Sequence, residues 1–367
     1  MRSWVILLVM ACPGRLTAQV VSAKIPPSAS VLEAEQVLEP LVESYGVSGM
    51  EGPVRKTVER LLPRGLRPQP DTAGNLWLTL GKGEPVVVFV AHLDEIGFRV
   101  SGIRDDGTLE LSTLGGFFPS LWEAQPALVH TGDRSVSGVF LPRDSSAGEL
   151  RRTPPALRAD VGTRSQAATE ALGIRVGHTL TMPKEYVRLA GSRATARSFD
   201  DRVGSAAQVL AVRRLNSDRL KHTVIFLWSV REEIGLEGAR AAANALGLRP
   251  ARVHAIDTFV SADSPLEPQN FAVAPLGRGA VARALDNSSV TPPPLVDSLV
   301  ALARAAGVAL QVGTTNGGND GSVFSGYGVP DVPIGWPLRY SHSPAETIDL
   351  RDVVSLADVI VAIAERW

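Results

Sequence analysis

The sequence has one cysteine in 367 residues, Cys12, and it lies close to the N-terminus. The rest of the chain therefore has no partner for a disulfide bond and no thiolate that could bind a metal. Any metal in the folded protein must be held by histidine, aspartate and glutamate side chains.

An excess of charge of either sign is also missing. The 37 lysines and arginines nearly balance the 38 aspartates and glutamates, and the formal net charge is −1. Proteins that bind nucleic acids or anionic membrane surfaces usually carry a basic excess, so we expect neither kind of partner. The apolar fraction of 44% and the charged fraction of 20% place the chain among soluble globular proteins.

The apolar run near the N-terminus, Trp4 to Met10, is too short to span a bilayer as a helix. It follows Arg2 and precedes Leu16-Thr17-Ala18, a stretch that fits a signal-peptide cleavage site. We therefore expect residues 1–18 to be a secretory signal peptide. The mature protein is then exported to the periplasm or the extracellular space, without a transmembrane segment.

Two alternatives stay open for this segment. Val9-Met10-Ala11-Cys12 loosely resembles a lipoprotein processing site, which leaves open an exported protein anchored to lipid through Cys12. If the segment is not a signal peptide, the protein is cytoplasmic.

The remaining sequence alternates between helical and strand patterns. Pro85 to Ala91 is apolar at nearly every position, as expected of a strand buried on both faces of a sheet. From Gly97 to about Val187 the sequence consists of short segments in which apolar and polar residues alternate, separated by glycine, proline and aspartate turns. This pattern is typical of a small β-rich, barrel-like domain. We predict an α/β domain with a mixed sheet and helices on both faces, formed by residues 30–96 and 188–367. The inserted β domain is formed by residues 97–187.

The stretch from Lys221 to Gly235 is the centre of this prediction. It begins as an apolar strand and ends in two adjacent carboxylates, Glu232 and Glu233, just before a helix. Sites in open α/β sheets form beyond the carboxyl ends of strands, and neighbouring residues there point in different directions. One glutamate could then bind a metal while the other moves a proton. Taken alone, the pair is better explained as the first turn of a helix, where the helix dipole favours acids.

Other strand ends and loops carry further candidate ligands. His92 follows the strand that ends at Ala91, Asp257 ends a third strand, Asp200 precedes a helix, and His342 lies in a loop before another helix. Two histidines and several carboxylates at one sheet edge suit a catalytic zinc, cobalt or manganese site, and a shared carboxylate can bridge two ions. Each residue alone has an ordinary explanation, such as a core histidine or a helix cap. The remaining histidines do not fit the pattern and are interpreted as structural: His130, His178, His222 and His254.

Five motifs containing these residues occur in a fixed order: His92-Leu-Asp94-Glu-Ile-Gly-Phe98, Phe199-Asp200-Asp-Arg-Val-Gly204, Arg231-Glu232-Glu233-Ile-Gly235, Asp257 with Asp263-Ser-Pro265, and Arg339-Tyr-Ser-His342-Ser-Pro-Ala-Glu346. In this order they resemble the tetrahedral (glutamyl or deblocking) aminopeptidases. That family of dinuclear metallopeptidases is related to the zinc aminopeptidases. The resemblance spans nearly the whole mature chain and includes Gly46-Val-Ser-Gly-Met-Glu51, Gly173-Ile-Arg-Val-Gly177 and Asn319-Asp-Gly321.

The resemblance implies two divalent metal ions per subunit, with zinc expected and cobalt or manganese as alternatives. Asp200 would bridge the two ions, and the peptide bond between Asp200 and Asp201 would be cis, as in related enzymes. His92 and Asp257 would complete the ligands of one ion. Glu233 and His342 would complete those of the other.

The resemblance also implies roles in the reaction. Glu232 would be the general base that takes a proton from a metal-bridging water and delivers it to the leaving amine. Asp94 would accept a hydrogen bond from the ring of His92 and fix its tautomer. Asp263 and Asp320 are the candidates for supporting the free α-amino group of the substrate.

The implied function is that of an aminopeptidase that removes N-terminal residues from peptides. The family also implies a homo-oligomer, a dimer built by the inserted domain, with a twelve-subunit tetrahedral shell as the larger assembly. The sequence after Asp257 is bulkier than in the family, and Asn319-Asp-Gly321 replaces its usual Thr-Asp-Ala, so the family's side-chain preferences are not carried over. A deacylase or amidohydrolase acting on non-peptide amides with the same metals, and a non-catalytic scaffold, are the alternatives.

Overall fold

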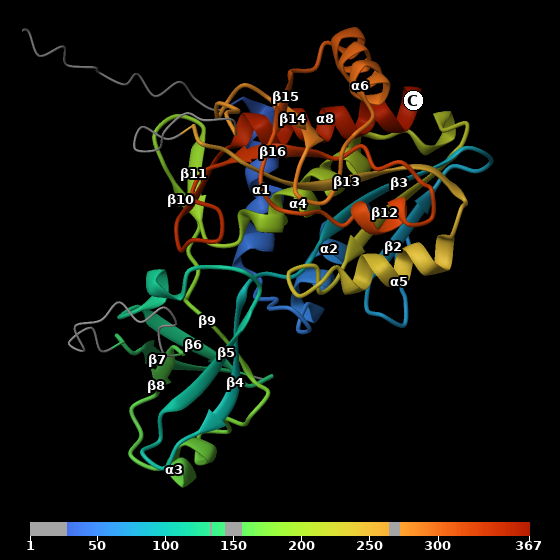
Figure 1. The fold of residues 1–367 in the computed structure, drawn as a ribbon. Helices are drawn as coiled ribbons and strands as arrows, with labels where there is room; N and C mark the ends of the chain where they lie inside the picture. Colours follow the sequence, from blue (N-terminus) through green and yellow to red (C-terminus); the bar gives the residue numbers. More distant parts are fainter. Residues whose placement is uncertain (1–27, 133, 144–155, 264–271) are drawn as a thin grey trace, which may run out of the picture.

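The structure is a computed structural model. It describes residues 28–132, 134–143, 156–263 and 272–367. The predicted signal peptide and Cys12 lie outside the described residues. The described chain forms an α/β domain with a small β barrel inserted into it, which confirms the predicted fold class (Figure 1).

An eight-stranded mixed sheet forms the middle of the α/β domain, in the strand order β1-β2-β12-β3-β13-β16-β14-β15. Strands β12, β3, β13 and β16 are parallel to one another, whereas β2 and β14 run antiparallel to their neighbours β12 and β16. The strands are β1 (Gln69–Pro70), β2 (Leu76–Leu80), β3 (Val86–His92), β12 (Thr223–Ser229), β13 (Pro250–Val260), β14 (Ala280–Leu285), β15 (Leu310–Thr314) and β16 (Ile334–Leu338).

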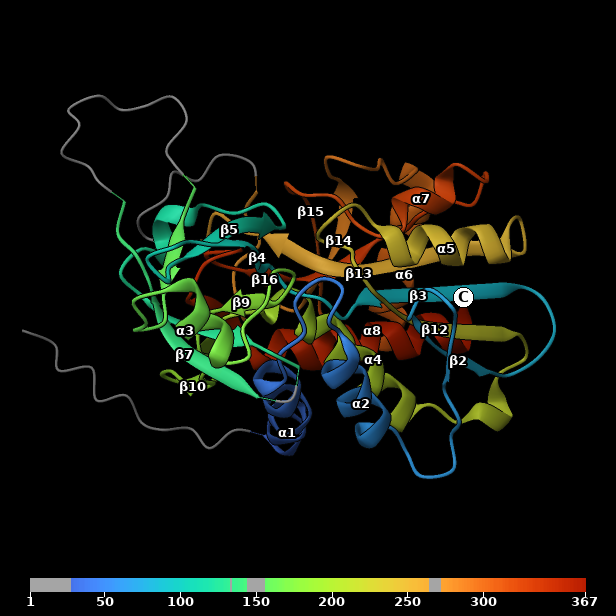
Figure 2. The same ribbon diagram turned by 90° about the horizontal axis from the view of Figure 1, so that it is seen from below.

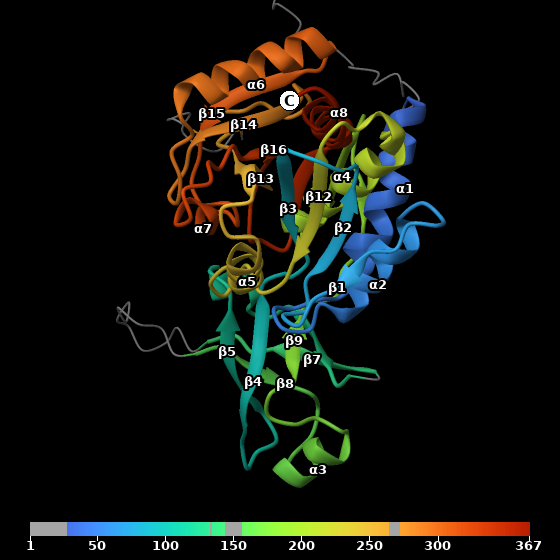
Figure 3. The same cartoon turned by 90° about the vertical axis from the view of Figure 1, so that its right-hand side faces the viewer.

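Helices cover both faces of this sheet (Figure 3). Side chains alternate between the two faces of a strand, so Val87 and Phe89 of β3 pack into one core and Val88 and Val90 into another. The first core contains α1 (Ala29–Glu43), α2 (Gly52–Leu61), α4 (Phe199–Arg214), α6 (Pro293–Ala306) and α8 (Leu350–Arg366). The second core is closed by α5 (Glu237–Leu246) and α7 (Ser322–Ser325).

The parallel register of β12 and β3 brings their carboxyl ends to the same edge. The paired residues run from Thr223 opposite Val86 to Ser229 opposite His92. Strand β13 pairs with the other side of β3 and is also parallel to it. Residues that follow β3 and β12 therefore meet next to β13, which is the geometry that the sequence predicted.

The inserted domain is a closed barrel in the strand order β4-β5-β8-β7-β6-β9. Figure 2 shows the molecule from below the view of Figure 1, from the end at which the barrel lies. Three aromatic residues pack together in its otherwise aliphatic core: Phe98, Trp122 and Phe140, with ring centroids 5.2 to 5.5 Å apart. Its elements are β4 (Gly97–Ile103), β5 (Leu109–Leu114), η1 (Pro119–Trp122), β6 (Pro126–His130), β7 (Ser135–Phe140), β8 (Arg158–Asp160), α3 (Gln166–Ala171) and β9 (Thr179–Thr181).

The chain returns to the α/β domain soon after β9. Strand β10 (Val187–Arg188) pairs with β11 (Arg193–Ala196), which pairs with β17 (Glu346–Asp349) just before α8. Val187 is the residue at which we expected the inserted domain to end, and it already belongs to this three-stranded sheet. The short helix η2 (Ser217–Arg219) precedes β12.

A buried cluster of charges joins the two connections between the domains. Glu95, just before the barrel, lies 3.0 Å from Nζ of Lys184, just after it, and 2.9 Å from Nη2 of Arg197. Burial disfavours the charged form of Glu95, but Arg197, Lys184 and Arg202 hold its pKa well below the usual range. The ion cluster therefore fixes where the barrel sits against the sheet edge.

None of the helices in the described part of the chain combines the length and the apolarity needed to cross a bilayer.

Candidate metal centre

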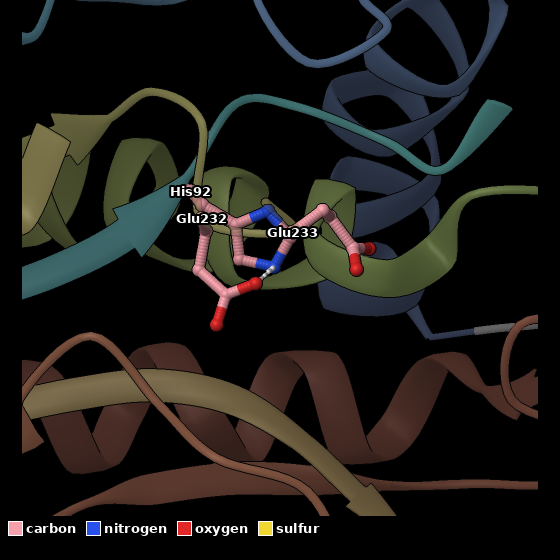
Figure 4. Close-up of side chains that lie close together, drawn as sticks. All are labelled: His92, Glu232 and Glu233. Atoms are coloured by element: carbon pink, nitrogen blue, oxygen red, sulfur yellow. Dashed lines mark ion pairs between the residues drawn. The ribbon is translucent and has the colours of Figure 1, made fainter. Parts of the chain in front are cut away.

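Candidate ligands from several separate segments meet at the carboxyl edge of the sheet. Figure 4 shows His92 at the end of β3 beside Glu232 and Glu233 of the loop that follows β12. Nε2 of His92 lies 3.9 Å from Oε2 of Glu232. These three residues form one group whose ligand atoms all lie within 4.8 Å of one another.

Two further groups share Asp200. In one group it lies with His92 and Asp257, and in the other with Glu233 and His342, again with ligand atoms within 4.8 Å. Oδ1 of Asp200 is 3.1 Å from Nε2 of His92, and Oδ2 is 3.3 Å from Nε2 of His342. Each carboxylate oxygen thus faces a different histidine, as a bridging carboxylate does. All five residues expected as metal ligands are brought together.

Asp200 and Asp201 have different surroundings although they are neighbours. Their peptide bond is cis, which confirms the prediction made from the resemblance. The carboxylate of Asp201 accepts hydrogen bonds from the backbone N–H of Gly204 at 2.8 Å and of His92 at 2.9 Å. Asp201 therefore caps the helical part of α4 and holds the end of β3, which leaves Asp200 to face the histidines.

Asp94 has a wider role than the sequence suggested. Nδ1 of His92 lies 3.5 Å from Oδ1 of Asp94 and 3.2 Å from the main-chain oxygen of the same residue. The carboxylate of Asp94 also accepts hydrogen bonds from the backbone N–H groups of Glu232 at 2.9 Å and Glu233 at 3.2 Å. Asp94 therefore supports the loop that carries both glutamates as well as the ring of His92.

The centre holds more negative charge than its buried surroundings favour. Burial raises the pKa of Glu232 well above the usual range, and Asp257, Glu233 and Asp320 add to this rise while His92 opposes it. Burial and the neighbouring Asp200 raise the pKa of Asp257 to about 7 despite the opposing charge of Arg283.

The two imidazoles respond in the opposite direction. Burial disfavours the charged form of His92, but hydrogen bonds to Asp200 and Asp94 outweigh burial and raise its pKa well above 6.5. The carboxylates of Glu233 and Asp200 likewise raise the pKa of His342, against the effect of burial. Crowded carboxylates of this kind are stabilised by positive charge.

The residues present fit two divalent cations. Each group that contains Asp200 offers carboxylate oxygen and imidazole nitrogen and no sulfur, which suits zinc, cobalt or manganese. Oε1 of Glu233 is buried, accepts no hydrogen bond from the described residues and lies 3.3 Å from Nε2 of His342, an oxygen and a nitrogen that could both bind one cation.

Glu346 belongs to the centre, although the sequence analysis assigned it no role. Its Oε1 accepts a hydrogen bond from the backbone N–H of His342 at 2.9 Å, and its Oε2 accepts one from that of Asp200 at 3.2 Å. Burial and the charge of Asp200 raise its pKa to about 8. One side chain therefore holds the backbone of two candidate ligands. Its place at the end of the motif from Arg339 to Glu346 was the only signal in the sequence.

The inserted barrel also reaches the centre. Nδ1 of His342 lies 2.5 Å from the main-chain oxygen of Gly116, in the loop after β5. Gly115 has a positive φ of 94°, and a Cβ added there would come within 2.6 Å of the side chain of Ile96 and 3.3 Å of Oε2 of Glu233. The close approach explains why glycine stands at this position.

The two candidates for supporting the substrate amine do not line the cavity at the centre. Asp263 pairs with Nη2 of Arg339 at 2.9 Å, and Asp320 is buried and hydrogen-bonded to the hydroxyl of Ser229. Their roles stay predictions. The cavity has a volume of about 490 Å³ and is lined by Gly116, Asp200, Glu232, Glu233, Leu236, Asp257, Thr258, Val260, Arg283, Asn316, Gly317, Gly318, Ser341 and His342.

The four histidines interpreted as structural belong to none of the three groups. His254, for example, is fully buried, and its Nδ1 donates a hydrogen bond to the main-chain oxygen of Val332 at 2.9 Å.

Comparison with known proteins connects this centre to a reaction. The family model of M42 glutamyl aminopeptidases matches residues 74–359. The glutamyl aminopeptidase of Lactococcus lactis is 28% identical over 90% of this chain and 96% of its own length. The lysyl aminopeptidase of Pyrococcus furiosus is 30% identical, also over 90% of this chain and 96% of its own length.

Solved structures show the same fold. The TET1 peptidase of Pyrococcus horikoshii, which can assemble into a tetrahedron or a large octahedral shell, superposes with a TM-score of 0.83 at 31% identity. It covers 91% of this chain and 100% of its own. An aminopeptidase of Desulfurococcus kamchatkensis has a TM-score of 0.85 at 28% identity and covers 92% of this chain and 96% of its own. The chain therefore belongs to the M42 glutamyl aminopeptidase family and is a metal-dependent aminopeptidase.

Proposed function

We propose that two divalent cations are held by the two groups that share Asp200. His92, Asp200 and Asp257 would hold one cation, and Asp200, Glu233 and His342 the other. The observation that carries this assignment is the separation of the two oxygens of Asp200, 3.1 Å from one histidine and 3.3 Å from the other. When bound, the cations would polarise the scissile carbonyl and make a water molecule more acidic.

Glu232 is the proposed general base. It lines the cavity, lies next to His92, and belongs to neither of the two groups that contain Asp200. Its carboxylate takes a proton from the attacking water while the water oxygen bonds to the peptide carbonyl carbon. When the carbon–nitrogen bond breaks, the same carboxyl group gives the proton to the departing amine.

The substrate is a peptide with a free α-amino group. The cavity at the centre has a volume of about 490 Å³, which lies within the usual range of pockets that bind small ligands and suits the end of a peptide. The test is a panel of fluorogenic aminoacyl substrates, each free or N-acetylated, assayed with zinc, cobalt or manganese. Hydrolysis of only the free amines supports the aminopeptidase assignment. Cleavage of the acetylated set instead would assign a deacylase.

Zinc is the proposed native metal because imidazole and carboxylate ligands without thiolate suit its catalytic sites. Cobalt and manganese share this preference, so the metal content of protein purified without added metal decides between them. Two metal atoms per chain, measured by elemental analysis, are the expected result.

We also propose a homo-oligomer, a dimer or a larger shell, on the likeness to the TET1 peptidase that forms tetrahedral and octahedral shells. Light scattering coupled to gel filtration distinguishes a dimer from a dodecamer by mass. Export is a proposal from the sequence. Either residues 1–18 are removed, or, in the alternative, Cys12 is retained and carries a lipid. Cell fractionation and N-terminal sequencing of the purified protein test it.

A further inference from the structure

The turn Gly46-Val-Ser-Gly-Met-Glu51 has no part in the function described so far. It connects α1 to α2, far from β12 in the sequence, yet two of its polar side chains are almost fully buried. The exposed fraction is 1% for Ser48 and 6% for Glu51. Burying a carboxylate and a hydroxyl is unfavourable unless both are hydrogen-bonded, so their partners show what the turn supports.

Glu51 binds the residue directly before the proposed base. Its Oε1 accepts hydrogen bonds from the backbone N–H of Arg231 at 3.1 Å and of Gly49 at 2.7 Å. Arg231 has a φ of 54°, a left-handed conformation that residues other than glycine rarely adopt. A backbone in this conformation needs support from its surroundings.

Ser48 acts on the same loop through Asp94. Its hydroxyl donates a hydrogen bond to Oδ2 of Asp94 at 2.7 Å. Asp94 in turn accepts the backbone N–H groups of Glu232 and Glu233. The backbone N–H groups of Arg231, Glu232 and Glu233 therefore donate to two buried carboxylates. The turn contributes one of them, that of Glu51, and its Ser48 donates a hydrogen bond to the other, that of Asp94. Hydrogen bonds to a charged acceptor are roughly twice as strong as those between neutral groups.

The turn is itself anchored to the connection between the domains. The backbone N–H of Gly46 donates to Oε1 of Glu95 at 2.7 Å, and the N–H of Glu95 donates to the main-chain oxygen of Gly46 at 3.0 Å. Glu95 is the centre of the buried ion cluster with Lys184 and Arg197. The turn is therefore a rigid support for the loop.

Glu51 is not among the residues that line the cavity at the metal centre. It lines a different cleft of about 720 Å³, together with Glu43 and Arg231. The side chain therefore does not belong to the wall that meets the substrate, and its effect on the reaction must pass through the backbone of Arg231.

We propose that Glu51 is a positioning residue for peptide hydrolysis, which sets the direction of Glu232 by holding the left-handed backbone of Arg231, with Ser48 as its assistant through Asp94. This inference rests on the proposed role of Glu232. A shift of about 1 Å in a catalytic group costs on the order of 100-fold in rate, so the loss of this support lowers kcat strongly.

The test uses full-length enzyme with its metals and compares four variants. Glu51→Gln keeps an oxygen that can accept from Arg231 and is expected to stay within a few fold of the parent. Glu51→Asp keeps the carboxylate, but its shorter side chain moves the carboxylate away from the N–H of Arg231. Glu51→Ala removes the carboxylate. We expect both to lower kcat by about 10- to 100-fold with little change in KM and with two metals still bound. Ser48→Ala is expected to lower kcat in the same direction but by less.

Glu43→Ala is the matched control, because this exposed glutamate lines the same cleft and is not hydrogen-bonded to the loop. Its kcat is expected to equal that of the parent. Parental kcat in both Glu51→Ala and Glu51→Asp overturns the proposal. Loss of metal in step with loss of kcat also overturns it, because the residue would then act on the ligands and not on the base. If Glu51→Ala does not fold, the contrast between the glutamine and aspartate variants decides.

Glu232→Gln assayed in parallel separates this inference from the proposed function. Full activity of Glu232→Gln removes the base and, with it, the reason for positioning it. An inactive Glu232→Gln beside a fully active Glu51→Ala overturns only the role of Glu51.

Discussion

The carboxylate of Asp94 accepts a hydrogen bond from the backbone N–H of Glu232 at 2.9 Å. Asp94 lies two residues after His92, and its Oδ1 is also 3.5 Å from Nδ1 of that ring. A single buried acid thus holds both a candidate metal ligand and the backbone of the proposed base. The relative position of metal and base is set by this link between β3 and the loop after β12.

Replacing Glu232 with glutamine removes the proton acceptor and keeps the shape of the side chain. We expect turnover to fall by about 10²- to 10⁴-fold, the usual contribution of general acid–base catalysis. Metal content is expected to stay at the parental value, because Glu232 lies outside both groups that contain Asp200. Steady-state kinetics and elemental analysis of the same preparation check both statements. A variant that keeps its turnover would show that another group moves the proton.

Asp200→Asn tests the shared carboxylate. Asp200 faces His92 with one oxygen and His342 with the other, so its loss weakens both proposed metal positions. We expect fewer than one metal per chain and a fall in activity of about 10³-fold, in line with the several kcal/mol that metal ions contribute to catalysis. Asp257→Asn is the comparison, because Asp257 belongs to only one of the two groups and should leave the other metal bound. Equal metal loss in both variants would contradict the bridging role.

Glu95→Gln tests the buried ion cluster between the domains. The three cations Lys184, Arg197 and Arg202 would lose their shared carboxylate, and breaking a buried ion pair costs about 3–5 kcal/mol of unfolding free energy. Glu110→Gln is the control, since the pair that Glu110 makes with Arg104 is about half exposed, and such surface pairs contribute about 0–1 kcal/mol. Chemical denaturation measures both variants. Similar small losses for the two would mean that the cluster does not hold the domains together.

His254→Asn tests the stability of the sheet against acid. Burial lowers the pKa of His254 to about 3, so the folded protein keeps this ring neutral while the unfolded chain protonates it below about pH 6.5. Its contribution to stability is therefore complete above pH 6.5 and is lost as the pH falls toward 3.

Asparagine can keep the hydrogen bond to Val332 but does not titrate. We therefore expect the stability advantage of the parent over His254→Asn to shrink by about 1.4 kcal/mol for each pH unit between 6 and 4. Denaturant unfolding of both proteins at pH 7.5, 5.5 and 4.5 measures the difference. An advantage that does not change with pH would show that His254 is protonated in the folded state.

Much of the α/β domain could be predicted from local patterns. The apolar run predicted as a buried strand from Pro85 to Ala91 forms β3, Val86–His92, and each of its residues is buried. The apolar runs before His92 and Glu232 form adjacent parallel strands. Such elements depend on the spacing of apolar residues a few positions apart, which the sequence displays directly.

The partners of each acidic side chain at the site could not be predicted from the spacing of apolar residues. Asp200 and Asp201 are chemically alike and adjacent, yet one faces the two histidines and the other caps a helix and holds β3. Asp263 and Asp320, whose roles beside the substrate stay predictions, pair with Arg339 and Ser229 and are not among the residues that line the cavity. Glu346 had no assigned role and holds the backbone of two candidate ligands.

The sequence by itself determined the fold class, the inserted barrel, and the set of histidines and carboxylates that meet at one sheet edge. It did so because strand ends that follow apolar runs of a parallel sheet share an edge whatever their exact register. Only the tertiary structure decided which backbone N–H group each buried carboxylate accepts, as Glu51 accepts that of Arg231 and Asp94 that of Glu232. Those hydrogen bonds require atoms from distant segments to approach within about 3 Å, and such distances follow from packing and not from local pattern.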